Sequence, residues 1–514
     1  MRRALVLLVA LTVVGGCAVD DSEDSMATSE SGARLRTAAD DMQASQPMTS
    51  TTTPGTQTPA AYDAGGQAGL PPVGPSVDTA ADNRSTFALD VDTGSYTLAR
   101  RYLADGLLPD PALVRTEELV NYFEQDYDPP AKPGLAVHID GTAVPFLPDD
   151  TRVVRVGLQA WEVEPSERKP AALTFVIDVS GSMADGGRLE LVKESLTTLV
   201  SSLREGDTVA IVVYSDDARL VLEPTSAAER ETIARAIAEL QPLESTNAEA
   251  GLRLGYEVAR DGFREGAVNR VVLASDGVAN VGATGPEAIL AAVAEDAGKG
   301  IQLVSVGVGM GTYNDPLMEQ LADKGDGFYA YVDGPREAER LFVHDLTGTL
   351  QTVAMDAKVQ VEFDPARVAS YRLLGFENRA VADDQFRDDA VDGGEIGAGH
   401  TVTALYEVKL TEGARSGPLA TVTLRWADPD TREVTEIVES LDASSFSSSF
   451  AKTPPRLQRD IIVAAWGEAL RGGPWSQHLS LAGVADNARG LPELLTDDPD
   501  LAEFAALTRR AAEL

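Results

Sequence analysis

Five side chains in this chain carry oxygen atoms in a pattern that suits a metal ion: Asp178, Ser180, Ser182, Thr246 and Asp276. The first three are spaced at i, i+2 and i+4 directly after an apolar run, and the last follows a second apolar run. In an extended or gently turning loop, that spacing points all three side chains to one side. Two carboxylates balance a divalent ion, and hard cations take oxygen ligands. The set predicts a Mg²⁺ site, with Mn²⁺ or Ca²⁺ as alternative ions.

The segment that must position these residues alternates apolar runs with amphipathic stretches. We expect strands at 173–177, 208–214, 271–274 and 303–308, and helices at 189–203, 227–240, 248–260 and 287–299. Continuous apolar strands between such helices predict a parallel sheet covered on both faces. In these folds ligands bind outside the carboxyl ends of the strands. Asp178 and Asp276 both fall at such ends.

Alternation with a period of two, typical of half-buried antiparallel strands, occurs on both sides of this segment. Val137 and Ile139 share one face before it, and Val402 and Tyr406 share one face after it. Early helices are expected from after Tyr96 to about Leu103 and at 115–123, and late ones near 456–470 and 500–514. The predicted fold class is α/β. A doubly wound, mostly parallel, Rossmann-like sheet is inserted in, or flanked by, a β-rich sandwich-like domain with extra helices.

The first 17 residues have the pattern of a lipoprotein signal peptide. Arg2 and Arg3 precede an apolar stretch that is too short to span a bilayer, and Cys17 is the only cysteine. We expect cleavage before Cys17 and lipidation of its thiol, with palmitate among the lipids. The alternative is a chance cysteine after an ordinary signal peptide. Ala18 favours the outer membrane in a Gram-negative envelope; in other envelopes we expect the outer face of the plasma membrane.

The net charge excludes some classes of binding partner, and the composition indicates where the domains begin and end. The formal charge of −38 makes nucleic acid and bare anionic membrane poor partners. The stretch after Cys17 is rich in Ser, Thr, Pro and Ala, which predicts a disordered tether. The predicted parts are a signal peptide (1–17), the tether (18–84), an N-terminal segment with strands (85–168), the α/β domain (169–353) and a C-terminal β-rich and helical domain (354–514).

Each part of the proposed metal site also has a purely structural interpretation. Ser180 and Ser182 could cap the helix that is expected to begin near Leu189, and Thr246 could cap the next one. Asp276 and the glycine after it could form a plain turn. All three parts occur together, in order, at strand ends of one α/β domain, which favours the joint site.

A rival chemistry centres on Asp90 and Asp92, which superficially resemble the aspartate nucleophile motif of haloacid-dehalogenase-type phosphatases. The segment is short and leads into antiparallel strands, so we favour a helix cap at Asp92 or Thr93. The four histidines form no zinc motif, and neither a nucleophile elbow nor a phosphate loop appears. We therefore expect no enzyme activity and no catalytic residues, with an Asp90/Asp92 hydrolase as the remaining alternative.

Residues 170–355 resemble a von Willebrand factor A-type (VWA) domain, and the oxygen-rich set resembles its metal-ion-dependent adhesion site. The resemblance implies that Ser180, Ser182 and Thr246 bind Mg²⁺ directly, while Asp178 and Asp276 act largely through water. It also implies a membrane-anchored, adhesion-type protein that presents the ion to an Asp or Glu of an unidentified protein partner. A scaffold or assembly factor of an envelope complex is the alternative.

A wider resemblance covers the chain from about residue 80 to its end, which is similar to bacterial YfbK-like lipoproteins. The stretches that carry this wider match are Phe87–Tyr96, Glu377–Arg379 and Gly394–His400. Within the α/β domain, Gly307–Gly309, Tyr313–Asp315 and Ala322–Gly325 resemble the bacterial version of the VWA domain. One departure lies just before Ser245 and Thr246, where the family commonly has glycines and this chain has Leu243 and Glu244. Glu244 adds a negative charge near the expected ion.

Overall fold

The computed structural model describes residues 73–89, 93–243, 245–277, 286–309, 315–344 and 348–514, except positions 349, 390, 392, 415 and 448. All of these residues lie in one compact unit, Gln67–Leu514. Several predictions fall outside the described residues: the signal peptide with Cys17, the tether up to residue 72, Asp90, Asp92, Glu244 and the first two residues of Tyr313–Asp315. The expectation that the tether is disordered as far as residue 84 is wrong for its last part, because Val77–Asp78 form a strand that pairs with Tyr371 and Ser370. No helix in the described part of the chain is long and apolar enough to cross a membrane.

The α/β domain contains a six-stranded sheet with the strand order β10-β9-β8-β5-β6-β7. Its strands are β5 (Ala171–Asp178), β6 (Thr208–Tyr214), β7 (Ala218–Ser226), β8 (Val268–Ser275), β9 (Ile301–Val308) and β10 (Tyr329–Val332). All pairings are parallel except that of β7 with β6. The prediction of a doubly wound, mostly parallel sheet is confirmed. The edge strands β7 and β10 were not predicted, since no residue of β7 is buried and β10 has only four residues.

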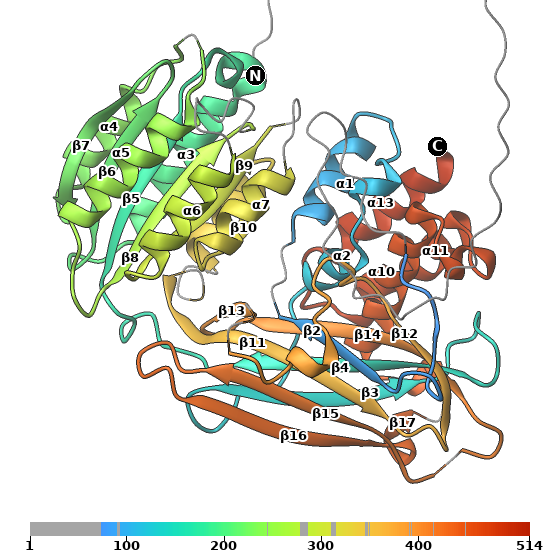
Figure 1. Cartoon of the computed structure of the whole chain (residues 1–514). Helices are drawn as coiled ribbons and strands as arrows, with labels where there is room; N and C mark the ends of the chain where they lie inside the picture. The colour runs from blue at the N-terminus through green and yellow to red at the C-terminus, as the bar shows by residue number, and fades with distance from the viewer. Residues whose placement is uncertain are drawn as a thin grey trace, which may run out of the picture. The chain divides into compact units, whose positions relative to one another are not determined.

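Helices cover both faces of this sheet (Figure 1). They are α3 (Arg188–Ser202), α4 (Arg230–Ala238), α5 (Ala248–Asp261), α6 (Pro286–Ala297), α7 (Asp315–Lys324) and α8 (Pro335–Glu339), with a π-helical turn at Arg340–His344. Because successive side chains of a strand point to opposite faces, β5 contributes to two cores. Phe175 and Ile177 pack in the cluster that includes α3 and α4, whereas Val176 packs in the one that includes α5, α6 and α7.

Two further sheets form a sandwich from strands on both sides of the α/β domain. One has the order β1-β12-β14-β4-β3-β17; the other has the order β13-β11-β15-β16, with β2 also paired to β11. The bounds are β1 (Val77–Asp78), β2 (Arg84–Ala88), β3 (Leu135–Thr142), β4 (Thr151–Ala160), β11 (Thr352–Phe363), β12 (Val368–Leu373), β13 (Gly394–Gly397), β14 (Thr401–Leu410), β15 (Pro418–Ala427), β16 (Val434–Asp442) and β17 (Phe446–Ser447).

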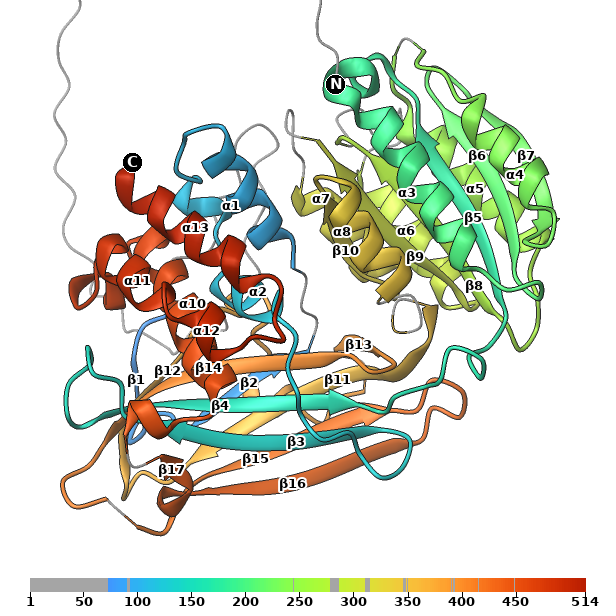
Figure 2. The same cartoon turned by 180° about the vertical axis from the view of Figure 1, so that it is seen from behind.

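The pairing of these strands shows how the α/β domain is connected. β4 pairs with β14, and β2 pairs with β11, so strands from before and after the α/β domain share each sheet (Figure 2). Side chains of both sheets, such as Val156 of β4 and Val361 of β11, belong to one buried cluster. The predicted insertion of an α/β domain into a sandwich is therefore confirmed.

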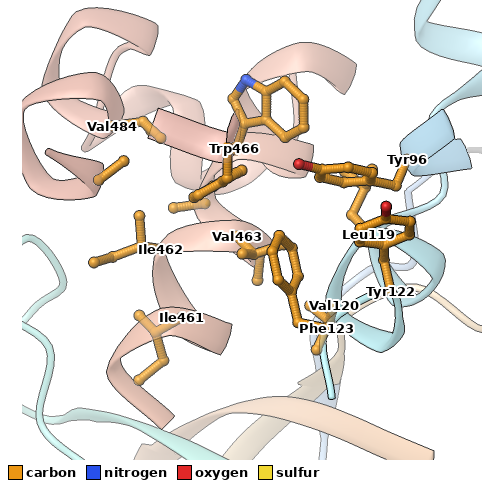
Figure 3. Close-up of a cluster of buried hydrophobic side chains, with 14 of the residues drawn as sticks. Tyr96, Leu119, Val120, Tyr122, Phe123, Ile461, Ile462, Val463, Trp466 and Val484 are labelled. Atoms are coloured by element: carbon orange, nitrogen blue, oxygen red, sulfur yellow. The ribbon is translucent and has the colours of Figure 1, made fainter. Parts of the chain in front are cut away.

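A helical layer also joins the two ends of the described chain. It contains α1 (Gly94–Ala104), α2 (Thr116–Asn121), α10 (Pro455–Arg471), α11 (Leu481–Ala488), α12 (Leu491–Leu494) and α13 (Leu501–Glu513). Tyr96 of α1 stacks on Tyr122 and meets Trp466 of α10 edge-on, which Figure 3 shows. Trp466 in turn packs against Phe504 of α13. The α1, α2, α10 and α13 predictions are confirmed; α11 and α12 are short and were not predicted.

Glu117 in α2 gives this layer a pH dependence. The residue is buried, its Oε2 has no hydrogen-bond partner in the described structure, and burial raises its pKa from 4.5 to about 7, with the negative charge of Glu377 adding to the effect. The folded pKa exceeds the unfolded one. The stability linked to this proton is therefore complete below about pH 4.5 and is lost as the pH rises to about 7.

We expect Glu117→Gln to remove this loss, because a neutral amide does not ionise. Urea unfolding at pH 5 and pH 8 should show that the wild type loses on the order of 3 kcal/mol more than the variant across this range. Equal pH dependence in the two proteins would contradict the assignment to Glu117.

Candidate metal centre

Asp178 is the last residue of β5, and neighbouring strands hold its carboxylate in place. Oδ1 accepts a hydrogen bond of 2.8 Å from the backbone N–H of Ser180. Oδ2 accepts one of 2.8 Å from the Ser275 hydroxyl at the end of β8 and one of 3.3 Å from the Tyr214 hydroxyl at the end of β6. The carboxylate is thus fully buried at the carboxyl ends of three adjacent parallel strands.

Burial raises the pKa of the Asp178 carboxyl above its ordinary value. Hydrogen bonds from Ser180 and Ser275 act in the opposite direction, while the negative charge of Asp276 raises the pKa further. A buried carboxylate with a second carboxylate nearby is stabilised in its charged form by a cation. The electrostatics of this position therefore suit a positively charged ligand.

The two serines and Asp276 form a chain of linked oxygen atoms. The Oγ atoms of Ser180 and Ser182 lie 3.1 Å apart, and the Ser182 hydroxyl donates to Oδ1 of Asp276 over 3.0 Å. Ser180 precedes a 3-10 turn at Gly181–Gly187, and neither this turn nor α3 has a side-chain cap. The capping interpretation of the serines is therefore wrong, because their hydroxyls point to one another and to Asp276.

Thr246 lies in the segment that leads into α5. The backbone N–H of Leu243 donates to the carbonyl of Val179 over 2.6 Å, which holds the start of this segment against the Asp178 loop. Asn247, not Thr246, caps α5, because its side chain accepts a hydrogen bond from the backbone N–H three residues on. The capping interpretation of Thr246 is wrong. Within the described residues its hydroxyl makes no hydrogen bond.

Asp276 also carries an ion pair that the sequence did not predict. Arg188, the first residue of α3, donates to Oδ2 of Asp276 over 2.6 Å and to the carbonyl of Ser182 over 3.0 Å. The chain bends at Asp276 and Gly277 has a φ of 143°, but the Asp276 side chain faces the linked oxygens, so a plain turn does not describe it. Ser275 was missed as well, although it directly precedes Asp276 in the sequence.

The donor set fits a hard cation. It offers two carboxylates and a group of hydroxyls, all of them oxygen donors, which is the chemistry that Mg²⁺, Mn²⁺ and Ca²⁺ accept. Among the described residues, no group of three or more His, Cys, Asp or Glu side chains is arranged to hold a metal. A site here would therefore depend on the hydroxyls of Ser180, Ser182 and Thr246 beside the two aspartates.

The rival interpretation of Asp90 and Asp92 as a hydrolase centre lies outside the described residues, and only the residues near them can be compared with it. Thr93 stands at the start of α1, as expected, but its side chain makes no capping hydrogen bond, so a cap at Thr93 is wrong, while the alternative cap at Asp92 lies outside the described residues. A ring nitrogen of His138 lies 2.9 Å from the carbonyl of Asp128, and the ring stacks on Tyr127. This contact gives His138 a structural role.

Three protein-family models match different parts of the chain. The von Willebrand factor type A domain model matches residues 172–343. The model described as uncharacterized protein YfbK, C-terminal, matches residues 348–514, and a model described as von Willebrand factor matches residues 73–155. The five residues predicted to form a metal site lie within the first of these matches.

Similar proteins include a bacterial one that covers most of the chain. Uncharacterized protein YfbK of Escherichia coli is 36% identical over 473 residues, which are 85% of this chain and 79% of that protein. Human inter-alpha-trypsin inhibitor heavy chain H3 is 32% identical over 167 residues, 31% of this chain and 18% of that protein. The solved structure of von Willebrand factor type A from Catenulispora acidiphila is 15% identical, with a TM-score of 0.40, and covers 71% of this chain and 87% of that one.

Proposed function

Since this chain belongs to the YfbK family of proteins with a von Willebrand factor type A domain, we propose that it captures a protein partner through a divalent cation. A VWA domain indicates protein–protein interaction or adhesion. The observation that supports the finer proposal is the chain of linked oxygens from Ser180 through Ser182 to Asp276, beside the buried Asp178.

The residues that would hold the ion are Asp178, Ser180, Ser182, Thr246 and Asp276. Hydroxyls are weak ligands, so an ion held largely by them keeps a strong attraction for further anions. Mg²⁺ usually retains several waters, and a bound ion would offer an Asp or Glu of the partner a position in its ligand shell. This chemistry is capture of a carboxylate and needs no nucleophile or general base, so we propose a binding protein and not an enzyme.

We also propose that a lipid on Cys17 anchors the protein in the cell envelope, and that the stretch from residue 18 to the start of the sandwich strand β1 at Val77 acts as a tether. The support is the pattern of a basic start, a short apolar stretch and a single cysteine. We expect Cys17→Ser to move the protein from the membrane fraction to the soluble fraction after a high-salt wash, because a thiol is needed for lipidation. Unchanged fractionation of the variant would contradict the anchor.

The capture itself is tested by cross-linking in intact cells that express the wild-type chain, with and without a divalent-ion chelator. We expect one or more cross-linked protein partners to disappear when the chelator is present and to return when Mg²⁺ is restored. Ser182→Ala should lose the same cross-links in the absence of chelator. Cross-links that persist under both treatments would contradict ion-dependent capture and would favour a scaffold that binds through other surfaces.

A further inference from the structure

We propose that Arg188 sets the charge of the metal centre: it weakens the binding of the cation and strengthens the binding of a carboxylate to the loaded site. The inference rests on the proposed function, because it concerns the same cation and the same partner group. It assigns a role to a residue that is not among the five proposed ligands.

The contacts of Arg188 place a positive charge directly on a proposed metal-site carboxylate. One guanidinium nitrogen lies 2.6 Å from Oδ2 of Asp276 and 3.0 Å from the carbonyl of Ser182. The side chains of Arg188 and Asp276 are only 16% and 6% exposed, so water screens this pair incompletely. The other oxygen of Asp276, Oδ1, faces the Ser182 hydroxyl.

The chain is built to keep Arg188 in this position. Gly309 follows β9, and its backbone φ of +80° is one that residues other than glycine rarely adopt. A Cβ on Gly309 would overlap the Arg188 side chain, at 2.6 Å from Cδ and closer still to Nε. The arginine therefore lies across the backbone at the end of β9, with its charged end at the end of β8.

The charges show what this arrangement does. When both aspartates are ionised, the net charge of Asp178, Asp276 and Arg188 together is −1. A bound divalent ion changes this net charge to +1. Without Arg188, the two aspartates would carry two negative charges, and a bound divalent ion would neutralise them. Arg188 thus repels the cation but leaves an excess positive charge for an incoming carboxylate.

Arg188→Gln tests the inference, because glutamine keeps a hydrogen-bond donor and removes the charge. Mn²⁺ is the first probe, and calorimetric titration measures its affinity. Acetate is the second probe: when it binds the Mn²⁺-loaded protein it displaces water from the ion, and the change in water-proton relaxation measures its affinity. We expect the variant to bind Mn²⁺ on the order of tenfold more tightly and acetate on the order of tenfold more weakly, since a unit charge at contact distance in a partly screened site has this effect.

Two matched variants serve as controls. Arg188→Lys keeps the charge and should resemble the wild type in both titrations more closely than Arg188→Gln does. Arg260→Gln removes an arginine that pairs with Asp296, also at 2.6 Å, in the last turn of α5, and should leave both affinities unchanged. Gly309→Ala provides a second route, because its Cβ displaces Arg188; it should raise Mn²⁺ affinity even if Arg188→Gln fails to fold.

The outcomes separate this inference from the proposed function. Equal or weaker Mn²⁺ binding by Arg188→Gln and Gly309→Ala, or unchanged acetate binding, overturns the role of Arg188 and leaves the metal centre intact. Absence of saturable Mn²⁺ binding in the wild type and in every variant overturns the metal centre and the proposed function together.

Discussion

Asp178→Asn is expected to reduce Mg²⁺ affinity by about 100-fold or more while the ion-free protein stays folded. The variant removes one of the two carboxylate charges. The remaining carboxylate, Asp276, already pairs with Arg188, so the empty site would be neutral and would attract a cation weakly. Calorimetric titration with Mg²⁺ measures the loss of affinity, and an unchanged affinity would show that Asp178 does not contribute to binding the ion.

The stability of the ion-free variant gives an independent check on the environment of Asp178. Burial raises its pKa above the ordinary value, so the stability linked to its proton is complete below that value and is lost as the pH rises through the folded pKa. Asparagine does not ionise, and the hydroxyls of Ser275 and Tyr214 can rotate to accept its N–H groups. In a chelator, urea unfolding should therefore show that the variant gains stability relative to the wild type as the pH rises above the ordinary pKa of an aspartate.

Arg372→Ala is expected to cost about 3–5 kcal/mol of unfolding free energy. Arg372 in β12 binds both carboxylate oxygens of Glu468 in α10, over 3.1 and 3.0 Å, and also Glu407 over 2.8 Å. The side chains of Arg372 and Glu468 are 3% and 1% exposed. Removing the guanidinium leaves the Glu468 carboxylate buried without its cation, at the contact between the sandwich and the helical layer.

Urea unfolding at pH 7 measures this effect. Arg84→Ala is the matched control, because Arg84 pairs with Glu362 at 3.1 Å but both side chains are about half exposed, and such pairs contribute under about 1 kcal/mol. The double variant Arg372→Met with Glu468→Leu should recover most of the loss, since it removes the unpaired charge. A cost for Arg372→Ala no larger than that for Arg84→Ala would contradict the buried pair.

The sequence was sufficient for the parts of the fold that repeat a local pattern. The strand and helix that flank Asp178 are visible as an apolar run and an amphipathic stretch, and the order of alternation predicts parallel pairing. The β16 strand and helices α11 and α12 were not predicted, because β16 is mostly exposed and the two helices are only eight and four residues long. Their positions depend on what they pack against.

The same distinction applies to the metal centre. Asp178, Ser180 and Ser182 could be identified because their spacing is local, and Asp276 because it ends an apolar run. Arg188 contacts Asp276 across 88 positions, and Tyr214 contacts Asp178 across 36, so these contacts exist only through the register of the sheet. A single sequence shows no signal for Arg188, and Tyr214 is marked only as the end of an apolar strand.

The insertion of the α/β domain has a consequence for the order in which the chain folds. Thr86 of β2 contacts Gln360 of β11, 274 positions away, so the sandwich can close only after the whole α/β domain has been made. The parallel sheet has all its strands within Ala171–Val332 and can fold first. Until then β3 and β4 can pair with each other, but β2 lacks its partner β11 and β4 lacks its partner β14. Long loop closure makes such pairing slow. Folding intermediates of this chain should therefore hold a native α/β domain beside an open, aggregation-prone sandwich.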